Sequence, residues 1–148
     1  MAYDWAPDVQ DVADLLRART VEGGTGIEAG TFTGNTRPTS AAVQGLVDRA
    51  SGEVVSGLGR AVPTKLESSA RRVATLRAAM WVELSYFPEQ IETGQSPYAE
   101  YKTLYTEGLT ALQGELETET GVDSVTGGSG MPVFGFPIDC SPLGEARW

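Results

Sequence analysis

Three glutamates, Glu83, Glu89 and Glu92, lie close together in a chain that contains no histidine. Two carboxylates placed on either side of a glycosidic bond can hydrolyse it, one acting as the acid and the other as the base or nucleophile. No feature of the sequence fixes the distance between these glutamates, and carboxylates are common on helix surfaces and in loops. Their proximity alone therefore does not predict an active site.

Other common catalytic and metal-binding sets are absent from the sequence. Without histidine there is no histidine-containing triad or metal site. Cys140 is the single cysteine, so it cannot form an intramolecular disulfide, and no basic neighbour activates its thiol. The glycine-rich stretch EGGTGIEAG lacks the Gly-Lys-Ser/Thr ending of a phosphate-binding loop. We expect a protein that is not an enzyme and that uses no cofactor or metal.

Glu83 stands out because it lies beside Trp81 and Leu84 in the most apolar predicted helix. A buried carboxylate needs a cationic or hydrogen-bonding partner, since an unpaired buried charge is strongly destabilising. The expected partners, in the same or a neighbouring chain, are Arg71, Arg72 and Arg77.

The net charge of −9 argues against binding to nucleic acid through its phosphates, which requires a basic surface. An acidic surface keeps a protein soluble, and it also repels DNA. No apolar run approaches the roughly 18 residues of a membrane span, and the N-terminus does not resemble a signal peptide. We expect no membrane contact.

Apolar residues recur at helical spacing in four stretches before residue 121, and no stretch there alternates as a strand does. The third stretch is apolar over so wide an arc that it should pack on more than one side, with Trp81, Leu84 and Phe87 in the core. The fold class predicted is all-α, a small bundle of about four helices. The first helix should start near Pro7 and stop before the 22–39 loop, and the second should run from Thr39 to Gly57 and Gly59. The third should start at a Thr64–Glu67 capping box and stop at Pro88. The fourth should start at Ser96 and stop at Gly121.

Two segments fall outside this helical pattern. The Gly- and Thr-rich stretch 22–39 reads as a long loop that is either mobile or engaged with something, such as DNA or a neighbouring subunit. Residues 122–148 form a C-terminal arm after a helical domain of residues 1–121. The arm is richer in apolar residues than a disordered tail, so it either packs on its own bundle or docks on another subunit or protein. Its docking residues would be Met131, Pro132, Val133, Phe134, Phe136, Pro137, Ile138 and Trp148.

The third and fourth helices carry opposite charge. Residues 65–82 contain four basic side chains and one acidic, whereas residues 89–120 contain one basic and seven acidic. Pairing within the chain or exposure to solvent would explain this, and exposed pairs contribute only about 0–1 kcal/mol. Alternatively, the basic face of one copy meets the acidic face of the next, as in a head-to-tail ring.

Three segments in order carry a family resemblance. They are TFTGNTRPTSAAVQGLVDRASGEVVSGLG, ARRVATLRAAMWVELSYFPEQ and SPYAEYKTLYTEGLTALQGEL, which start at Thr31, Ala70 and Ser96. Together they resemble the head–tail adaptor proteins of long-tailed bacteriophages, also called head-completion or head-to-tail connector proteins, and in particular those of phages that infect actinobacteria. The resemblance covers residues 5–120, and the last 28 residues match no such pattern.

The resemblance implies a structural virion protein with an α-helical fold. Such adaptors form a ring, typically a dodecamer, between the portal at the capsid vertex and the stopper or tail. They assemble in the host cytoplasm and belong to the neck of the virion, and DNA passes through the ring without sequence-specific binding. A C-terminal segment reaches toward the portal in relatives.

The expected contacts between subunits follow from the helix charges and from the corner WVELSYFPEQ. Tyr86 lies off the apolar stripe, and Glu89 and Gln90 follow the helix stop at Pro88. The full set expected at subunit contacts is Arg71, Arg72, Arg77, Glu83, Tyr86, Glu89 and Gln90. The alternative function is a soluble helical bundle that binds a small ligand or regulates a partner.

Overall fold

The computed structural model describes residues 3–119, and within this range the chain is built from helices with no strand. Two isolated bridges, Val21 to Glu28 and Glu22 to Thr36, are the β-type pairings in this part of the chain. The expected all-α fold is confirmed. The elements are α1 (Val9–Leu15), η1 (Arg17–Arg19), α2 (Ser40–Leu58), η2 (Thr64–Leu66), α3 (Glu67–Tyr86), α4 (Pro88–Glu92) and α5 (Tyr98–Glu119). The arm residues 122–148 lie outside the described range.

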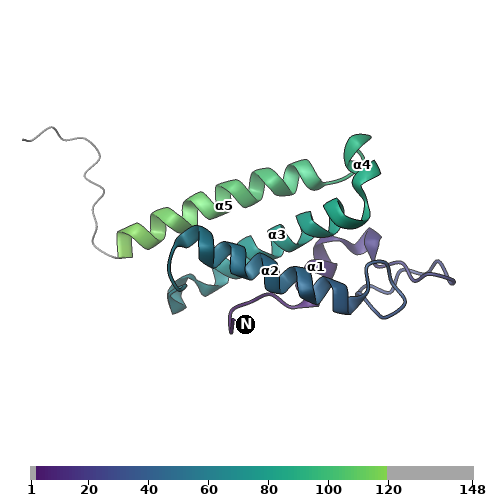
Figure 1. The fold of residues 1–148 in the computed structure, drawn as a ribbon, viewed down its shortest axis with the longest axis horizontal. Coiled ribbons are helices and arrows are strands. Elements are labelled where there is room, and N and C mark those ends of the chain that lie inside the picture. Colours follow the sequence, from purple (N-terminus) through teal and green to yellow (C-terminus); the bar gives the residue numbers. More distant parts are fainter. Residues whose placement is uncertain (1–2, 120–148) are drawn as a thin grey trace, which may run out of the picture.

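Helix α3 is the centre of the bundle (Figure 1). The long helix α5 runs antiparallel along one side of α3, and α1 and α2 pack on the other side. Half of the residues of α3 are buried, which confirms the expectation that its wide apolar arc packs on several sides. One core cluster joins α1 and α2 to the C-terminal half of α3. A second joins Trp5, the end of α2 and Leu112 and Leu116 of α5 to the N-terminal half of α3.

Local sequence signals set most of the helix ends. The Thr39 hydroxyl accepts a hydrogen bond from the Ala42 amide at 3.3 Å, as expected of an N-cap. Gly59 ends α2 in the left-handed conformation, with φ of 69°. At α1 the cap is Asp8, which forms a reciprocal capping box with Asp11.

The predicted start of the third helix is wrong. Thr64 opens the short turn η2, and α3 begins at Glu67 without a side-chain cap. Pro88 does end α3, but it also opens the short helix α4, which the sequence pattern did not predict. Proline is tolerated in a first helical turn because the amide it lacks would have no partner there.

The C-terminal end of α3 is less buried than its apolar stripe predicts. Leu84 is 37% exposed, and Trp81 and Phe87 are half-buried. Val82 and Glu83 in the same turns are fully buried, so Leu84 lies on the outer face of α3, and Phe87 follows the end of that helix at Tyr86. The expectation that Leu84 lies in the core is therefore wrong.

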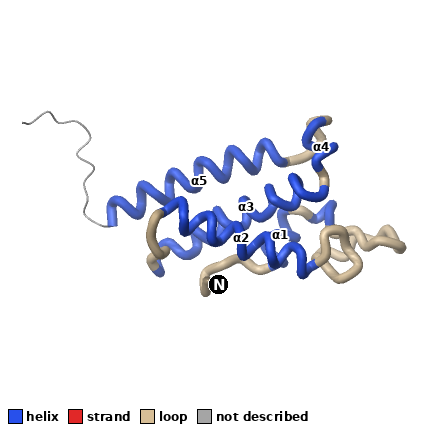
Figure 2. Tube along the Cα trace, viewed as in Figure 1, coloured by secondary structure: helices blue, strands red, loops and turns tan. Residues whose placement is uncertain are grey.

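The Gly- and Thr-rich loop between η1 and α2 extends beyond the helices (Figure 2). It is fastened by its own backbone, for example by the Gly23 amide, which donates to the Asn35 carbonyl at 2.9 Å. Phe32 is 3% exposed and belongs to the cluster of α1, α2 and α3. The part of the loop around Phe32 thus packs on the bundle of its own chain, whereas most of residues 21–30 are exposed, Ile27 to 65%.

Candidate functional site

A buried ion pair joins three segments near the turn from α3 to α5. Glu83 of α3 is fully buried and accepts hydrogen bonds from Arg19 at both carboxylate oxygens, at 2.8 and 3.0 Å. The Ser96 hydroxyl donates to the same carboxylate at 2.6 Å and accepts from the Tyr98 amide at 3.2 Å. Both carboxylate oxygens of Glu83 thus have hydrogen-bond partners within the same chain.

The expectation for Glu83 was right about its burial and pairing and wrong about its partner. The partner is Arg19 of η1, not Arg71, Arg72 or Arg77. Arg19 also lies over the ring of Phe87, with 4.1 Å between the guanidinium carbon and the ring centroid. Arg19 follows the first helix in an irregular turn, where no periodic pattern indicates which way a side chain points.

A second cluster, here called the α2–α5 seam, is built on Glu53 of α2. The Glu53 carboxylate accepts hydrogen bonds from Arg77, from Arg49 at 3.1 Å and from the Trp81 indole at 3.3 Å. Arg49 stacks on the Trp81 ring at 3.8 Å, and Arg77 lies 4.8 Å from the same ring. Arg77 also lies 5.2 Å from the ring of Tyr105 on α5. The seam therefore cross-links α2, α3 and α5.

The seam shifts the acidity of two of its members. Burial alone would raise the pKa of Glu53, but the hydrogen bonds and charge of Arg77, with Arg49 and Trp81, outweigh it and hold that pKa below its ordinary value of 4.5. Burial raises the pKa of Tyr105, with the charge of Arg77 acting against it. Glu53 is therefore held ionised and Tyr105 neutral near neutral pH.

The arginines of α3 find most of their partners inside the chain. Arg71 donates to Asp11 of α1 at 2.7 and 2.9 Å and approaches Asp8 at 3.3 Å. The hydrogen bond to Asp11 raises the pKa of Arg71. Arg77 likewise pairs with Glu53 of α2. The opposite net charges of the third and fourth helices therefore do not mean that each helix presents a face of unpaired charges. The place of these arginines and of Glu83 at a subunit contact stays a prediction.

Arg72 is the exception among these arginines. It is exposed and makes no ion pair with any of the residues that the structure describes. It lies where two adjoining depressions meet, of about 220 and 560 Å³, which share Arg72, Leu76 and Leu104. We call the combined depression between α1, α3 and α5 the acidic groove.

The acidic groove has an apolar floor and a charged rim. Leu76, Leu104 and Tyr101 contribute to its lining, and the Tyr101 hydroxyl donates to the Leu15 carbonyl at 2.9 Å. Its charged residues are five carboxylates and two guanidinium groups, namely Asp11, Asp14, Glu100, Glu107, Glu115, Arg71 and Arg72. Since Arg71 is engaged by Asp8 and Asp11, the remaining rim is acidic around the single Arg72.

The last three expected contact residues lie at the corner between α3 and α4. Tyr86 and Gln90 are half-buried and Glu89 is exposed. Their place at a subunit contact stays a prediction. The arm residues expected at the portal contact lie outside the described range.

The three glutamates considered for catalysis do not share one environment. Glu83 is closed off from solvent by Arg19 and Ser96, whereas Glu89 and Glu92 are exposed on α4. Within residues 3–119 no group of three or more metal-ligating side chains is close enough to hold an ion. No helix in the described part is both long and apolar enough to cross a membrane.

No protein-family model matches the chain. Comparisons with curated proteins and with solved structures give no match either. The function is therefore argued from the geometry of the seam and the groove and from the sequence resemblance.

Proposed function

We propose that this protein is a head–tail adaptor, a structural virion protein that forms a ring between the portal and the stopper or tail of a long-tailed bacteriophage. The observation that carries the proposal is the unequal charge on two sides of α5. The acidic groove presents five carboxylates against two guanidinium groups. The seam on the side toward α2 has two guanidinium groups against one carboxylate.

A closed ring made of one kind of subunit requires two different surfaces on each copy, one complementary to the other. A dimer with a two-fold axis uses the same surface twice and has no such requirement. The two sides of α5 differ in charge and in shape, which favours head-to-tail association. The sequence resemblance to adaptor proteins points to the same kind of assembly.

The bundle also has the rigidity that a ring subunit needs. The buried pair of Glu83 and Arg19 fixes the turn into α5, and the seam fixes α5 against α2. Buried polar networks that are fully satisfied hold one arrangement of the helices rather than several. In this proposal the polar side chains hold the subunit's shape and do not take part in catalysis.

The partners in this proposal are further copies of the chain, the portal, and the stopper or a tail-proximal head-completion protein, all in the neck of the virion. DNA passes through the ring without being bound in a sequence-specific way. An acidic protein surface repels the phosphates. If acidic residues face the lumen, neutralising them should slow the ejection of DNA, and unchanged ejection would contradict that part of the proposal.

The test is to mix the purified full chain with the isolated portal of the same virus and to measure the mass of the complex by native mass spectrometry. We expect a defined multiple of the 15.7 kDa subunit on each portal, typically a dodecamer. Adaptors of this kind can be monomeric before assembly, so the portal must be present. A chain that stays monomeric with the portal present would overturn the proposal.

The alternative is a soluble bundle that binds a small ligand or regulates a partner. The observation that favours it is the groove itself, whose larger depression of about 560 Å³ falls in the size range of ligand pockets. However, the groove is open and strongly charged, unlike the largely apolar clefts that enclose most small ligands. A monomer whose thermal midpoint rises with one class of small molecule, and which ignores the portal, would favour this alternative.

A further inference from the structure

We propose that the acidic groove of one copy is the docking site for the α2 side of the next copy, in the region of Arg60. This inference rests on the proposed ring and identifies the two surfaces that meet in it. It replaces the simpler expectation of a basic third helix facing an acidic fourth helix, because those helices pack against each other within one chain.

Several charged groups of the groove make no ion pair within the described residues, although the Asp14 carboxylate accepts a hydrogen bond from Gln10 at 2.9 Å. Asp14, Glu100, Glu107 and Glu115 make no ion pair with any residue in the range 3–119, and neither does Arg72. Other charges are paired across long sequence distances, as those of Arg71 and Arg77 are, whereas exposed Asp48 and Glu89 make no ion pair in this range either. The groove differs in bringing four such carboxylates together beside Leu15, which is 39% exposed.

Arg60 lies on the side of α5 that faces α2. This exposed residue follows the end of α2 and shares a shallow depression with Gly57, Gln113 and Glu117. Arg60 makes no ion pair within the described residues. Arg49, on the same helix as Gly57, keeps 56% of its side chain exposed although it pairs with Glu53. Arg60 and the exposed part of Arg49 are thus the cationic groups of the α2 side, which also carries Glu117 in the same depression and exposed Asp48 on α2.

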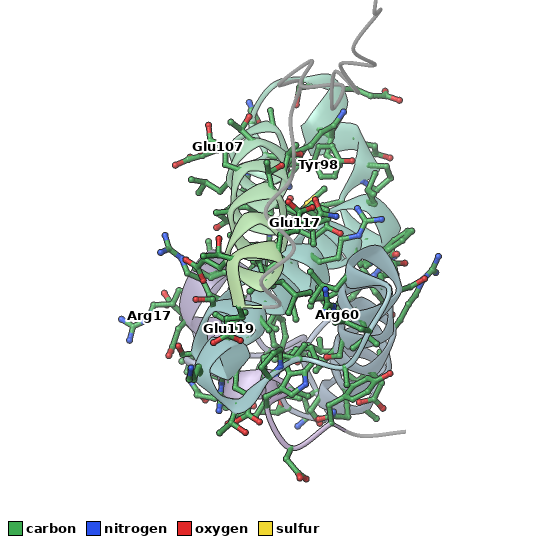
Figure 3. All side chains as sticks on the ribbon, turned by 90° about the vertical axis from the view of Figure 1, so that its left-hand side faces the viewer. Arg17, Arg60, Tyr98, Glu107, Glu117 and Glu119 are labelled. Atoms are coloured by element: carbon green, nitrogen blue, oxygen red, sulfur yellow. The ribbon has the colours of Figure 1, made fainter. Side chains whose placement is uncertain are left out.

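The two surfaces lie on different sides of the subunit. Figure 3 shows Arg60 and Glu107 on opposite sides of α5. Two complementary patches on opposite sides of a subunit are what a head-to-tail contact needs, since each copy then offers one patch to each neighbour. Arg17 projects on the groove side as well, but below Glu107, and the groove side keeps an excess of carboxylates.

A second copy fits the groove better than other occupants do. Charge complementarity favours a cationic group, and the α2 side offers Arg60 on the opposite side of α5 from Glu107. Complementary charge speeds association and fixes the register of two surfaces. Docking would also remove water from the exposed parts of Leu15 and Leu104 in the groove lining.

The experiment uses four full-length variants, Glu107→Lys, Arg60→Glu, the double variant with both changes, and Glu92→Lys as a control. The control makes the same charge change as Glu107→Lys at an exposed site on α4, outside both surfaces. Each protein is titrated onto the isolated portal, and the number of copies per portal is counted by native mass spectrometry at low salt. Circular dichroism and the thermal midpoint check that each variant is folded.

For the unchanged chain and for Glu92→Lys we expect cooperative filling, so that portals are either empty or full. Glu107→Lys and Arg60→Glu should each raise the concentration for half-filling by about tenfold, with partly filled portals, because like charges then face each other around the ring. The double variant restores opposite charge at the contact and should fill portals within about threefold of the unchanged concentration.

Normal filling by both single variants would overturn this inference while leaving the adaptor proposal in place. A double variant that is no better than the worse single variant would also overturn it. If the unchanged chain does not bind the portal at all, the adaptor proposal itself fails. Complete loss of binding by Glu107→Lys, without partly filled portals, would assign the groove to the portal contact and contradict the docking of a second copy.

Discussion

The turn from α3 to α5 and the acidic groove lie on the same helices, yet their charged side chains differ in burial and in pairing. At the turn, Glu83 is fully buried and each of its oxygens has a partner in the same chain. In the groove, Glu107 and Arg72 are exposed and unpaired within the described residues. The difference indicates that the first set of charges fixes the fold, whereas the second is available for contacts with other molecules.

The largest expected effect comes from breaking the buried pair. Glu83→Ala should lower the free energy of unfolding by about 3–5 kcal/mol, because it leaves the Arg19 guanidinium without its carboxylate in the protein interior. Urea unfolding of the full chain measures this. The matched control is Glu89→Ala on exposed α4, which should cost no more than about 0.5 kcal/mol. Similar costs for the two variants would mean that the pair does not hold the fold.

The seam should show an intermediate effect at Trp81. Trp81→Ala removes a half-buried ring that lies against two guanidinium groups, and we expect a loss of about 2–3 kcal/mol in the free energy of unfolding. Trp81→Phe keeps a ring at this position and loses the indole hydrogen bond to Glu53, so it should cost about 1 kcal/mol. Equal losses for the two variants would show that stacking contributes nothing.

The seam also predicts a pH dependence. The pKa of Glu53 is lower in the folded chain than its ordinary value of 4.5, so the unfolded chain binds the proton more readily. Glu53 therefore stabilises the fold above pH 4.5, and this contribution is lost as the pH falls through its lower folded value. Glu53→Gln should be less stable by about 1 kcal/mol at pH 7, and the difference should shrink below pH 4.5.

Stability measured across this pH range by urea unfolding tests the prediction for Glu53. The control is Asp48→Asn on the same helix, an exposed carboxylate that should change stability by no more than about 0.5 kcal/mol. A constant difference between Glu53→Gln and the unchanged chain at all pH values would show that the folded pKa of Glu53 is not lowered.

The smallest effect is expected for the neighbouring arginines Arg71 and Arg72, of which the first is paired and the second is not. Arg71→Ala breaks the pair with Asp11 and should cost at most about 1 kcal/mol at low salt and less at high salt. Arg72→Ala removes an unpaired groove residue and should leave the free energy of unfolding unchanged within about 0.5 kcal/mol. A larger loss for Arg72→Ala than for Arg71→Ala would mean that the groove stabilises the fold.

Local signals in the sequence were sufficient for most of the architecture. The Thr39 cap, the glycine at the end of α2 and the Ser96–Pro97 start of α5 act over a few residues, so their effect can be read directly from the sequence. The capping box expected at Thr64 failed because that residue opens a 3₁₀ turn instead. The short helix α4 does not follow from the sequence pattern, because Pro88 both ends α3 and occupies the first turn of the next helix.

The candidate surfaces were harder to predict because they depend on contacts between distant residues. Nothing near Arg19 in the sequence indicates that it meets Glu83, 64 residues away. Phe32 lies in a Gly- and Thr-rich loop, yet it enters the core. The sequence shows that the third helix is rich in arginine. It does not show that Arg71 and Arg77 have carboxylate partners on α1 and α2, because those pairs depend on the packing of the helices.

The most direct test of the account is a low-resolution electron-microscopy image of the full chain bound to the portal of its own virus. We predict a closed ring of identical subunits, coaxial with the portal and open at its centre, in which every copy contacts its two neighbours through different surfaces. Isolated monomers or two-fold dimers on the portal, or no added density at all, would contradict the proposed head-to-tail ring.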